Sequence, residues 1–355
     1  MWENRHEFIS SLHYSKWKGK YTMKIDCPNC HKAYNIPDEK LPMGKKFSIP
    51  CPACKWTIRF DLRVKEEPGK RVTGEALKNK ILQELIGVLP PMPQVVIKAR
   101  QIVSDESSGL KDLATVIASD QAITVRALKL ANSAYYGLRQ RVTSIGHASV
   151  LLGGKVLREI VVMAGTQGLL PDKLKGYELG SGALWRHSLA VAVGSRLVAE
   201  MRYPELANNA FTAGLIHDVG KVMLDEHISE RKDEFKELLK NGETTFLEAE
   251  KEIFGFDHAE IGSEVINIWG LPEVLSSAIT YHHTPSNSEE DKLAHIIHLA
   301  DFISVTGGSE TGVEGVLYEM DEGTMEFLSL EDDDISDITD QVFRYVDSIT
   351  EKMGG

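Results

Sequence analysis

The stretch Gly214-Leu-Ile-His-Asp-Val-Gly-Lys221 places an adjacent histidine and aspartate inside an apolar segment that we expect to be a buried helix. Two further apolar helical segments each carry a side chain of the same kind, His187 in one and Asp301 in the other. An unpaired buried charge is costly, so several such groups together indicate mutual hydrogen bonding or a bound cation. The candidate metal ligands are therefore His187, His217, Asp218 and Asp301.

This ligand set predicts a particular kind of metal site. Adjacent His217 and Asp218 can reach two sides of one ion, and side chains from two other helices can complete its coordination. Mixed imidazole and carboxylate donors suit iron, manganese, zinc or nickel and leave positions for water. Lys221, one turn after His217, is placed to contact a phosphate oxygen. A hydrogen-bonded polar core without a metal is the alternative that these residues leave open.

The sequence after residue 74 is helical in pattern almost to its end. Apolar residues recur at three- and four-residue spacing from Leu77 to Leu85, and again from Val95 to Val103 after a proline-rich interruption. Ser119-Asp120 is typical of the start of a helix. Asn132 is expected to bond backbone carbonyls where that helix ends, with Gly137 as a left-handed exit. The fold class that we predict is mainly α.

Several motifs in this helical part resemble those of the HDOD domain, an HD-related output domain of bacterial signalling proteins. They are Leu89-Pro-Pro-Met-Pro93, Ile117-Ala-Ser-Asp120, Leu128-Lys-Leu-Ala-Asn-Ser-Ala-Tyr-Tyr-Gly137, Ser144-Ile-Gly-His-Ala148 and Leu151-Leu-Gly153. With the His and Asp residues above, the resemblance extends over about residues 77–310. It implies an all-helical HD-type domain of the HD phosphohydrolase superfamily.

The order of the polar residues is also similar to that in the HD-GYP phosphodiesterases, which use such residues for a centre of two or three metals. This resemblance implies a second metal at His258, His282 and His283. Ala183 stands where members with three metals have a glutamate ligand, so we expect at most two metals here. A Gly-Tyr-Pro loop does not follow His283, which argues against hydrolysis of cyclic di-GMP.

A second module precedes the helical part. Cys27-Pro-Asn-Cys30 and Cys51-Pro-Ala-Cys54 match the spacing of a structural zinc site with four thiolates. Short alternating segments around them predict strands, and zinc would supply the stability that so small a unit lacks. The segment resembles the small zinc-ribbon finger found at the front of many bacterial regulatory proteins.

The predicted organisation follows from these motifs and from the composition between them. We expect a disordered extension at 1–22, a β zinc ribbon at 23–62, a linker at 63–74, an HDOD domain at 75–310 with an N-terminal helical part at 75–170 and an HD-like part at 171–310, and an acidic C-terminal segment with an amphipathic helix at 311–355.

Charge and composition limit the possible partners. The net charge is −12 over 355 residues, but the first 80 hold 17 Lys and Arg against 9 Asp and Glu. The acidic remainder would repel nucleic acid, so binding through Lys45, Lys46, Lys55 and Arg59 of the ribbon is a minor alternative. No run of about 18 uncharged apolar residues and no signal peptide are found, so we expect a cytoplasmic protein without membrane insertion.

Three functions remain from the sequence. The first is a bacterial signalling or regulatory protein that acts through an HDOD domain with an intact metal site, binding signalling partners or a phosphate-containing ligand. The second is a metal-dependent phosphohydrolase that acts on a nucleotide or other phosphoester, with Asp218 and Lys221 as catalytic residues. The third is a nucleic-acid-binding regulator that uses the ribbon. The sequence leaves the oligomeric state, the signal and the substrate open.

Overall fold

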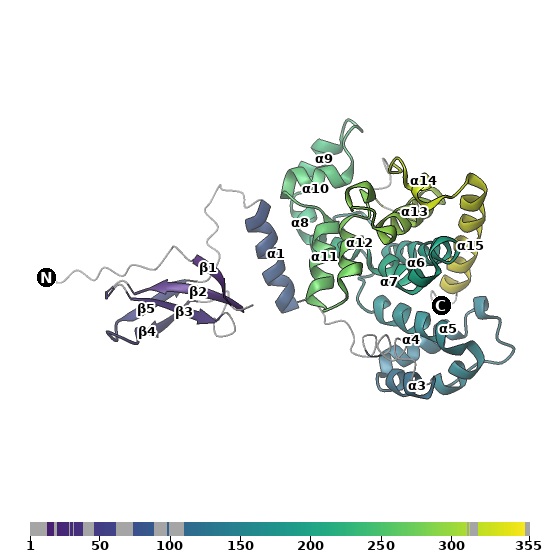
Figure 1. Ribbon diagram of the computed structural model, residues 1–355, viewed down its shortest axis with the longest axis horizontal. Coiled ribbons are helices and arrows are strands. Elements are labelled where there is room, and N and C mark those ends of the chain that lie inside the picture. Colours follow the sequence, from purple (N-terminus) through teal and green to yellow (C-terminus); the bar gives the residue numbers. More distant parts are fainter. Residues whose placement is uncertain are drawn as a thin grey trace. The chain divides into compact units, whose positions relative to one another are not determined.

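The computed structural model describes residues 13–17, 20–27, 29–30, 32–37, 46–61, 74–88, 98, 110–310, 312 and 319–351. The chain forms two compact units, Met1–Val72 and Thr73–Gly355 (Figure 1). The Leu89–Pro93 motif, nearly all of the helix predicted from Val95 to Val103, and the linker expected at 63–74, apart from its last residue, lie outside the described residues.

The first unit consists of antiparallel strands. Strands β1 (His13–Trp17), β2 (Lys20–Asp26) and β3 (Ala33–Pro37) form one sheet in that order, and β4 (Lys46–Pro50) pairs with β5 (Thr57–Asp61). The predicted β ribbon is therefore present. Its sheet begins earlier than predicted, because β1 lies within residues 1–22. Trp17 pairs with Lys20, so this strand joins the sheet through a local hairpin that needs no distant contact.

The second unit is helical, as predicted. Its elements are α1 (Gly74–Val88), α3 (Leu110–Ala118), α4 (Gln121–Ala131), η2 (Ala134–Tyr136), α5 (Ile145–Gln167), α6 (Ala183–Arg202), η3 (Pro204–Leu206), α7 (Ala207–Ile216), α8 (Val219–Glu230), α9 (Lys232–Leu239), α10 (Phe246–Phe254), α11 (His258–Ile268), α12 (Glu273–Thr280), η4 (Pro285–Asn287), α13 (Lys292–Thr306), α14 (Thr324–Leu328) and α15 (Asp332–Thr350). No helix among the described residues is long and apolar enough to cross a membrane.

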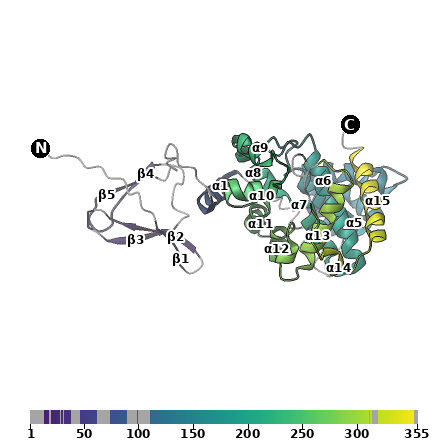
Figure 2. The ribbon, with the colours of Figure 1, turned by 90° about the horizontal axis from the view of Figure 1, so that it is seen from above.

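Helix α6 is central to this unit and packs against α7, α13 and α15 (Figure 2). Small residues allow these close approaches. A Cβ atom on Gly194 would lie 3.1 Å from the Cβ of Ala300 in α13, and one on Gly214 in α7 would lie 2.9 Å from the Cα of Ala192. Because α6 is surrounded in this way, His187 on its inner face is buried among other helices.

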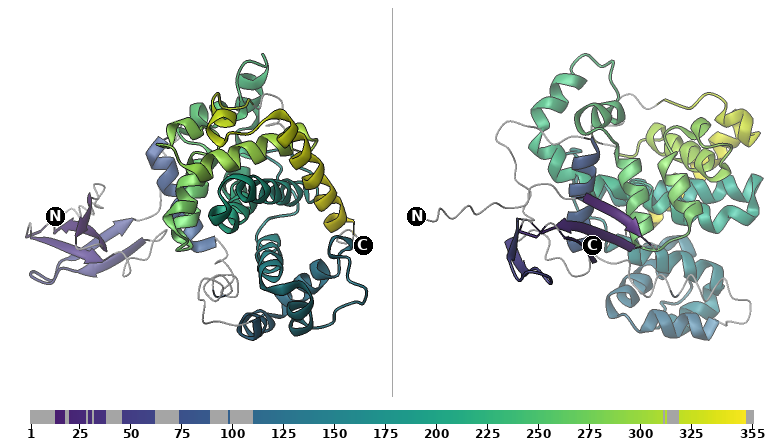
Figure 3. Two further views of the ribbon diagram at one scale, coloured as in Figure 1. Left: turned by 45° about the vertical axis from the view of Figure 1, so that its right-hand side comes forward. Right: turned by 60° about the vertical axis from the view of Figure 1, so that its left-hand side comes forward.

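The amphipathic helix predicted near the C-terminus is α15, and it packs on α6 (Figure 3). Its buried face consists of Ile338, Val342, Tyr345, Val346 and Ile349. Glu331 caps the helix through a reciprocal pair of hydrogen bonds with Asp334. The C-terminal segment thus completes the core of the helical unit.

Asn132 caps α4 as predicted. Its amide Nδ2 donates to the carbonyls of Leu128 and Val142 at 2.8 Å each, and its Oδ1 accepts the Val142 N–H at 2.8 Å. Gly137, which follows η2, has the expected left-handed conformation with φ of 57°. One side chain therefore joins the end of α4 to the loop before α5.

Replacing Asn132 with alanine should destabilise the helical unit by about 1–3 kcal/mol, because three backbone groups lose a partner. Chemical denaturation followed by circular dichroism would measure the change. The exposed Asn208, replaced in the same way, is the matched control and should change stability little. Equal stability of both variants would contradict a structural role for Asn132.

Candidate metal centre

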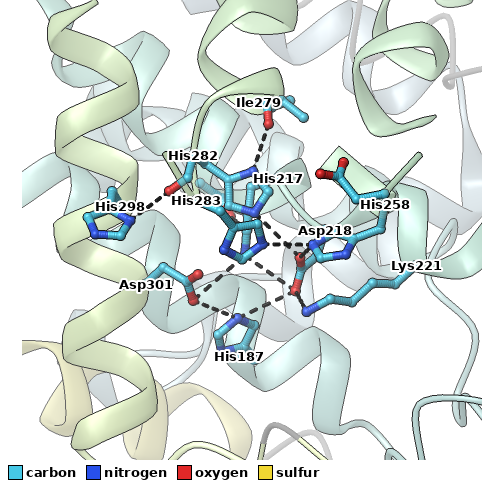
Figure 4. A network of polar contacts seen from close by, with 12 residues as sticks. His187, His217, Asp218, Lys221, His258, Ile279, His282, His283, His298 and Asp301 are labelled. Atoms are coloured by element: carbon cyan, nitrogen blue, oxygen red, sulfur yellow. Dashed lines mark hydrogen bonds and ion pairs between the residues drawn. The ribbon is translucent and has the colours of Figure 1, made fainter. Parts of the chain in front are cut away.

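Four helices bring the predicted ligands to one place in the core. His187 comes from α6, His217 from the end of α7, Asp218 from the start of α8, and Asp301 from α13 (Figure 4). The Nε2 atom of His187 lies 3.1 Å from Asp301 Oδ1 and 3.5 Å from Asp218 Oδ2. The Nε2 atom of His217 lies 3.3 Å from Asp218 Oδ2. We call these four side chains the first half of the candidate metal centre.

A second half lies on the other side of Asp218. It contains His258 at the start of α11, and His282 and His283 after α12. The Nε2 atoms of His258 and His283 are 2.9 Å apart. Asp218 Oδ1 lies 3.5 Å from Nε2 of His258 and 3.9 Å from Nε2 of His282. The carboxylate of Asp218 therefore presents one oxygen to each half, so it could serve as a ligand in both.

A close approach of two helices positions Asp218 opposite His258. Gly220 in the first turn of α8 faces the first turn of α11, where a Cβ atom would lie 1.9 Å from the carbonyl oxygen of His258. Gly262 continues the contact, and a Cβ there would meet the Gly220 nitrogen at 3.4 Å. Glycine at position 220 is thus required for the distance between the two halves.

The tautomers of two histidines follow from their hydrogen bonds. Nδ1 of His217 donates to the Gly214 carbonyl at 2.8 Å, and Nδ1 of His282 donates to the Ile279 carbonyl at 2.7 Å. A carbonyl oxygen can only accept, so the proton lies on Nδ1 in each ring. Nε2 then offers its lone pair to the interior of the centre.

Four atoms at the centre have no hydrogen-bond partner within the part of the chain that the structure describes, although all are buried. They are His217 Nε2, Asp218 Oδ1, His282 Nε2 and Asp301 Oδ1. The two carboxylate oxygens are acceptors, as are the two Nε2 atoms when their rings are neutral, and buried acceptors without donors are costly unless a cation is present. The residues consequently fit divalent metals bound by imidazole and carboxylate groups.

Comparisons with known proteins agree with this architecture. The HDOD domain model matches residues 89–285, which is more than half of the chain. The chain belongs to the HDOD family. A zinc-ribbon domain model matches residues 23–59.

Solved structures share the helical fold of the HDOD domain. A Geobacter sulfurreducens HDOD domain protein is 23% identical with a TM-score of 0.55, and the match covers 76% of this chain and 98% of that one. A Shewanella amazonensis protein provisionally named a phosphohydrolase is 23% identical with a TM-score of 0.59, covering 77% and 97%. At such identities the likeness shows the fold alone.

An uncharacterized protein of Treponema pallidum is 24% identical over 218 residues, which is 59% of this chain and 40% of that protein. The chain thus spans about two fifths of the length of this curated relative.

Burial and neighbouring charges set the ionisation states of the side chains in the candidate metal centre, which we call the HDOD centre. Burial would raise the pKa of Asp218, but the charges of His217 and Lys221 outweigh it and lower this pKa well below its usual range. Burial lowers the pKa of His282 to about 3, so its imidazole is neutral at neutral pH. An ionised carboxylate and a neutral imidazole are the forms that bind metals.

The pKa of His217 is raised, whereas that of His282 is lowered. Burial would lower it, but the carboxylate of Asp218 beside the ring raises it. A proton would therefore compete with a metal for Nε2 of His217, and a metal bound at this ring would displace that proton.

Lys221 lies inside the HDOD centre, where its ammonium group is paired. Its Nζ donates to Asp218 Oδ2 at 2.7 Å, and it lies 5.8 Å from the centre of the Tyr177 ring. The structure thus places Lys221 beside the candidate metal ligands. Its contact with a phosphate stays a prediction.

Sequence reasoning missed several residues that orient the ligands. The hydroxyl of Ser304 lies 3.0 Å from Nδ1 of His187, and the Glu250 carboxylate lies 2.8 Å from Nδ1 of His258. Glu250 had a detectable signal, because it falls on an apolar stripe of the helix with Phe246, Ala249 and Ile253. A charged residue at such a position is unusual and points to a buried partner.

His298 supports the loop that carries two ligands of the second half. Its Nδ1 donates to the carbonyl of His282 at 2.8 Å, and its Nε2 accepts the N–H of Asp321 at 2.8 Å. Both ring nitrogens are thus engaged with the backbone, which fixes His298 as a support of His282 rather than a ligand.

The four cysteines of the zinc ribbon also come together. Their Sγ atoms all lie within 4.8 Å of one another, with Cys27 3.6 Å from Cys54 and Cys30 3.7 Å from Cys51. A tetrahedral zinc with Zn–S bonds of about 2.3 Å requires S–S separations of roughly 3.8 Å. The spacing therefore fits zinc.

One thiol of this cluster is already poised to ionise. Burial would raise the pKa of Cys51, but hydrogen bonds from the Tyr34 hydroxyl, 3.4 Å away, and from backbone N–H groups lower it to about 6. The thiolate is the form that binds zinc.

Proposed function

We propose that this protein is a bacterial signalling regulator whose HDOD domain contains a centre of two divalent metals and acts by binding a signalling partner or a phosphate-containing ligand. The observation that carries the proposal is the carboxylate of Asp218, with one oxygen facing each of two sets of histidines. The four buried acceptors without donors support it, because a polar core without metal would leave them unsatisfied.

The burial of the ligands favours a regulatory over a catalytic role. His187, His217, Asp218, His258, His282 and Asp301 are all less than 5% exposed, and His283 alone of the seven is half-buried. A metal so enclosed stabilises the fold and links its occupancy to the position of the helices around it. Such a domain can change its affinity for a partner without turning over a substrate.

Elemental analysis of the purified protein should find one zinc from the ribbon and two further metals from the HDOD centre. The double variant His217→Ala/Asp218→Ala should retain the ribbon zinc alone, because it loses a first-half ligand and the carboxylate shared by both halves. The matched control is His147→Ala/Asp233→Ala, which removes the same side-chain types from exposed positions. Wild-type protein with no more than the ribbon zinc after metal reconstitution would refute the proposal.

The second candidate function is a metal-dependent phosphohydrolase, and the position of Lys221 favours it. Bound metal would supply Lewis-acid polarisation of a phosphoryl oxygen. The ammonium group of Lys221, paired with Asp218, is placed to stabilise negative charge that develops on a phosphate. The same two proteins assayed with bis(p-nitrophenyl) phosphate separate the candidates: turnover lost in the double variant supports the enzyme, and a metal-loaded wild type without turnover supports the regulator.

We further propose that the zinc ribbon is a docking module for a protein partner. Trp56, two residues after the last cysteine, is 51% exposed, and exposed aromatic side chains are frequent at protein interfaces. Nucleic-acid binding is the weaker proposal for this unit, since the acidic remainder of the chain opposes it.

A further inference from the structure

Glu250 is a fully buried carboxylate on α10, and its contacts lead to the second half of the centre. Its Oε2 accepts the backbone N–H of His258 at 2.9 Å and the ring Nδ1–H at 2.8 Å. Its Oε1 accepts the hydroxyl of Tyr177 at 2.5 Å. Within the described part of the chain these three donors satisfy a side chain that is 0% exposed. An apolar residue would fill the same place on α10 without the free-energy cost of removing a charge from water, so packing does not explain the carboxylate.

The carboxylate decides which atom of His258 faces the centre. An ionised carboxylate can only accept, so the proton of the His258 ring lies on Nδ1. Nε2 then carries the lone pair, and it points to the space shared with His283 Nε2 and Asp218 Oδ1, at 2.9 and 3.5 Å. This is where a second metal would have to bind.

The acceptor of the His258 ring N–H also differs from those of two other candidate ligands. His217 and His282 donate to neutral backbone carbonyls. His258 donates to a charged group, which increases the basicity of the opposite nitrogen and strengthens it as a metal ligand.

The rest of the structure keeps this carboxylate in place. Tyr177 is itself 0% exposed, and its loop is anchored by Asp225, whose Oδ1 accepts the N–H of Gly176 at 2.7 Å. A continuous set of contacts thus runs from Asp225 through the Tyr177 loop and Glu250 to His258.

We infer that Glu250 is a positioning residue that directs Nε2 of His258 into the second half of the centre, so that binding of the second metal depends on it. This inference rests on the proposed function, because it requires a metal centre in the HDOD domain. It assigns to Glu250 no contact with the metal or with a substrate.

The variant Glu250→Gln tests the inference with little change of shape. A glutamine oxygen can still accept from His258, and its amide can donate to the Tyr177 hydroxyl, but the negative charge is gone. We expect the second Mn²⁺ to bind roughly 10- to 100-fold more weakly, with the first unchanged. Glu252→Gln, the same change at an exposed position of α10, is the matched control and should bind both ions as the wild type does.

Titration of metal-depleted protein with Mn²⁺, followed by calorimetry and by electron paramagnetic resonance, provides the readout. The exchange-coupled spectrum of a metal pair should appear in the wild type and in Glu252→Gln, and should require more Mn²⁺ in Glu250→Gln. Wild-type affinity for both ions in Glu250→Gln would overturn the inference and leave the proposed function intact. A wild type that binds no Mn²⁺ in the HDOD domain would overturn both.

Thermal melting of the metal-free proteins separates a positioning role from a loss of fold. If Glu250→Gln does not fold, Tyr177→Phe replaces it, because this variant removes one hydrogen bond from Glu250 and leaves the His258 contacts. We expect a smaller weakening of the second Mn²⁺ in a protein that melts cooperatively. Unchanged affinity for both ions in that variant would overturn the inference.

Discussion

Replacing Gly220 with alanine should remove the second metal from the HDOD centre and destabilise the helical unit. The new Cβ atom would lie 1.9 Å from the His258 carbonyl oxygen and 2.8 Å from the Gly262 nitrogen, so α8 and α11 have to move apart. Their separation carries Asp218 away from His258, whose facing atoms are 3.5 Å apart. We expect a cost of about 1–3 kcal/mol from overpacking. Elemental analysis and denaturant unfolding would measure the two effects.

Gly146→Ala is the matched control for this experiment. Gly146 is an exposed residue within α5, and apart from its chain neighbours and its own helix backbone no heavy atom lies within 4 Å of the place where its Cβ would be. Alanine there should raise stability by about 0.5–1 kcal/mol, because a helical glycine is entropically costly. If Gly220→Ala retained two metals in the HDOD domain with wild-type stability, the close approach of α8 and α11 would not be needed for the centre.

Replacing Cys51 with serine should unfold the zinc ribbon while the HDOD domain stays folded. Cys51 is fully buried and its sulfur belongs to the cluster of four thiols. Zinc binding contributes about 10–16 kcal/mol to the folding of comparable zinc-finger peptides, and a hydroxyl is a poor substitute for a thiolate ligand. Because the ribbon and the helical part are separate compact units, we expect helical circular dichroism to persist.

Limited proteolysis and zinc analysis would check this result. Cleavage between residues 46 and 61 should become rapid in Cys51→Ser, and the zinc bound by the ribbon should be lost. Ala53→Ser places a serine at an exposed position of the same turn and should keep both zinc and protease resistance. A Cys51→Ser protein that retained its ribbon zinc would contradict a structural role for the metal.

Local patterns in the sequence predicted much of the architecture. The sequence predicted an amphipathic helix within residues 311–355, and α15 is that helix. The capping residue Asp120 was predicted from its side-chain type, and its carboxylate accepts the N–H of Ile123. These features depend on interactions between residues at most a few helical turns apart, so they can be predicted from the sequence.

The candidate ligands were found by a different kind of reasoning. Polar residues such as His217 and Asp218 stand in apolar helices, where burial without a partner would be costly. The cost of burial and the family resemblance together indicated seven side chains, and the structure brings them into one cluster. The sequence could not show that Asp218 faces both halves, because that depends on the approach of α8 to α11.

The residues that orient the candidate ligands through hydrogen bonds were not predicted. Glu250 and Tyr177 are 73 positions apart in the chain, and their hydrogen bond depends on the packing of α10 against the loop before α6. Strand β1 was also missed, since residues 1–22 contain no motif that distinguishes a short edge strand from an extension.

The sequence by itself determined the helical class, the zinc ribbon and the set of candidate ligands, because periodicity, cysteine spacing and buried polarity are local or compositional properties. Only the tertiary structure decided how the ligands divide around Asp218 and which groups orient them. Those relations are set by distances between helices, and a contact such as that of Gly220 with His258 is made by residues that are far apart in the chain.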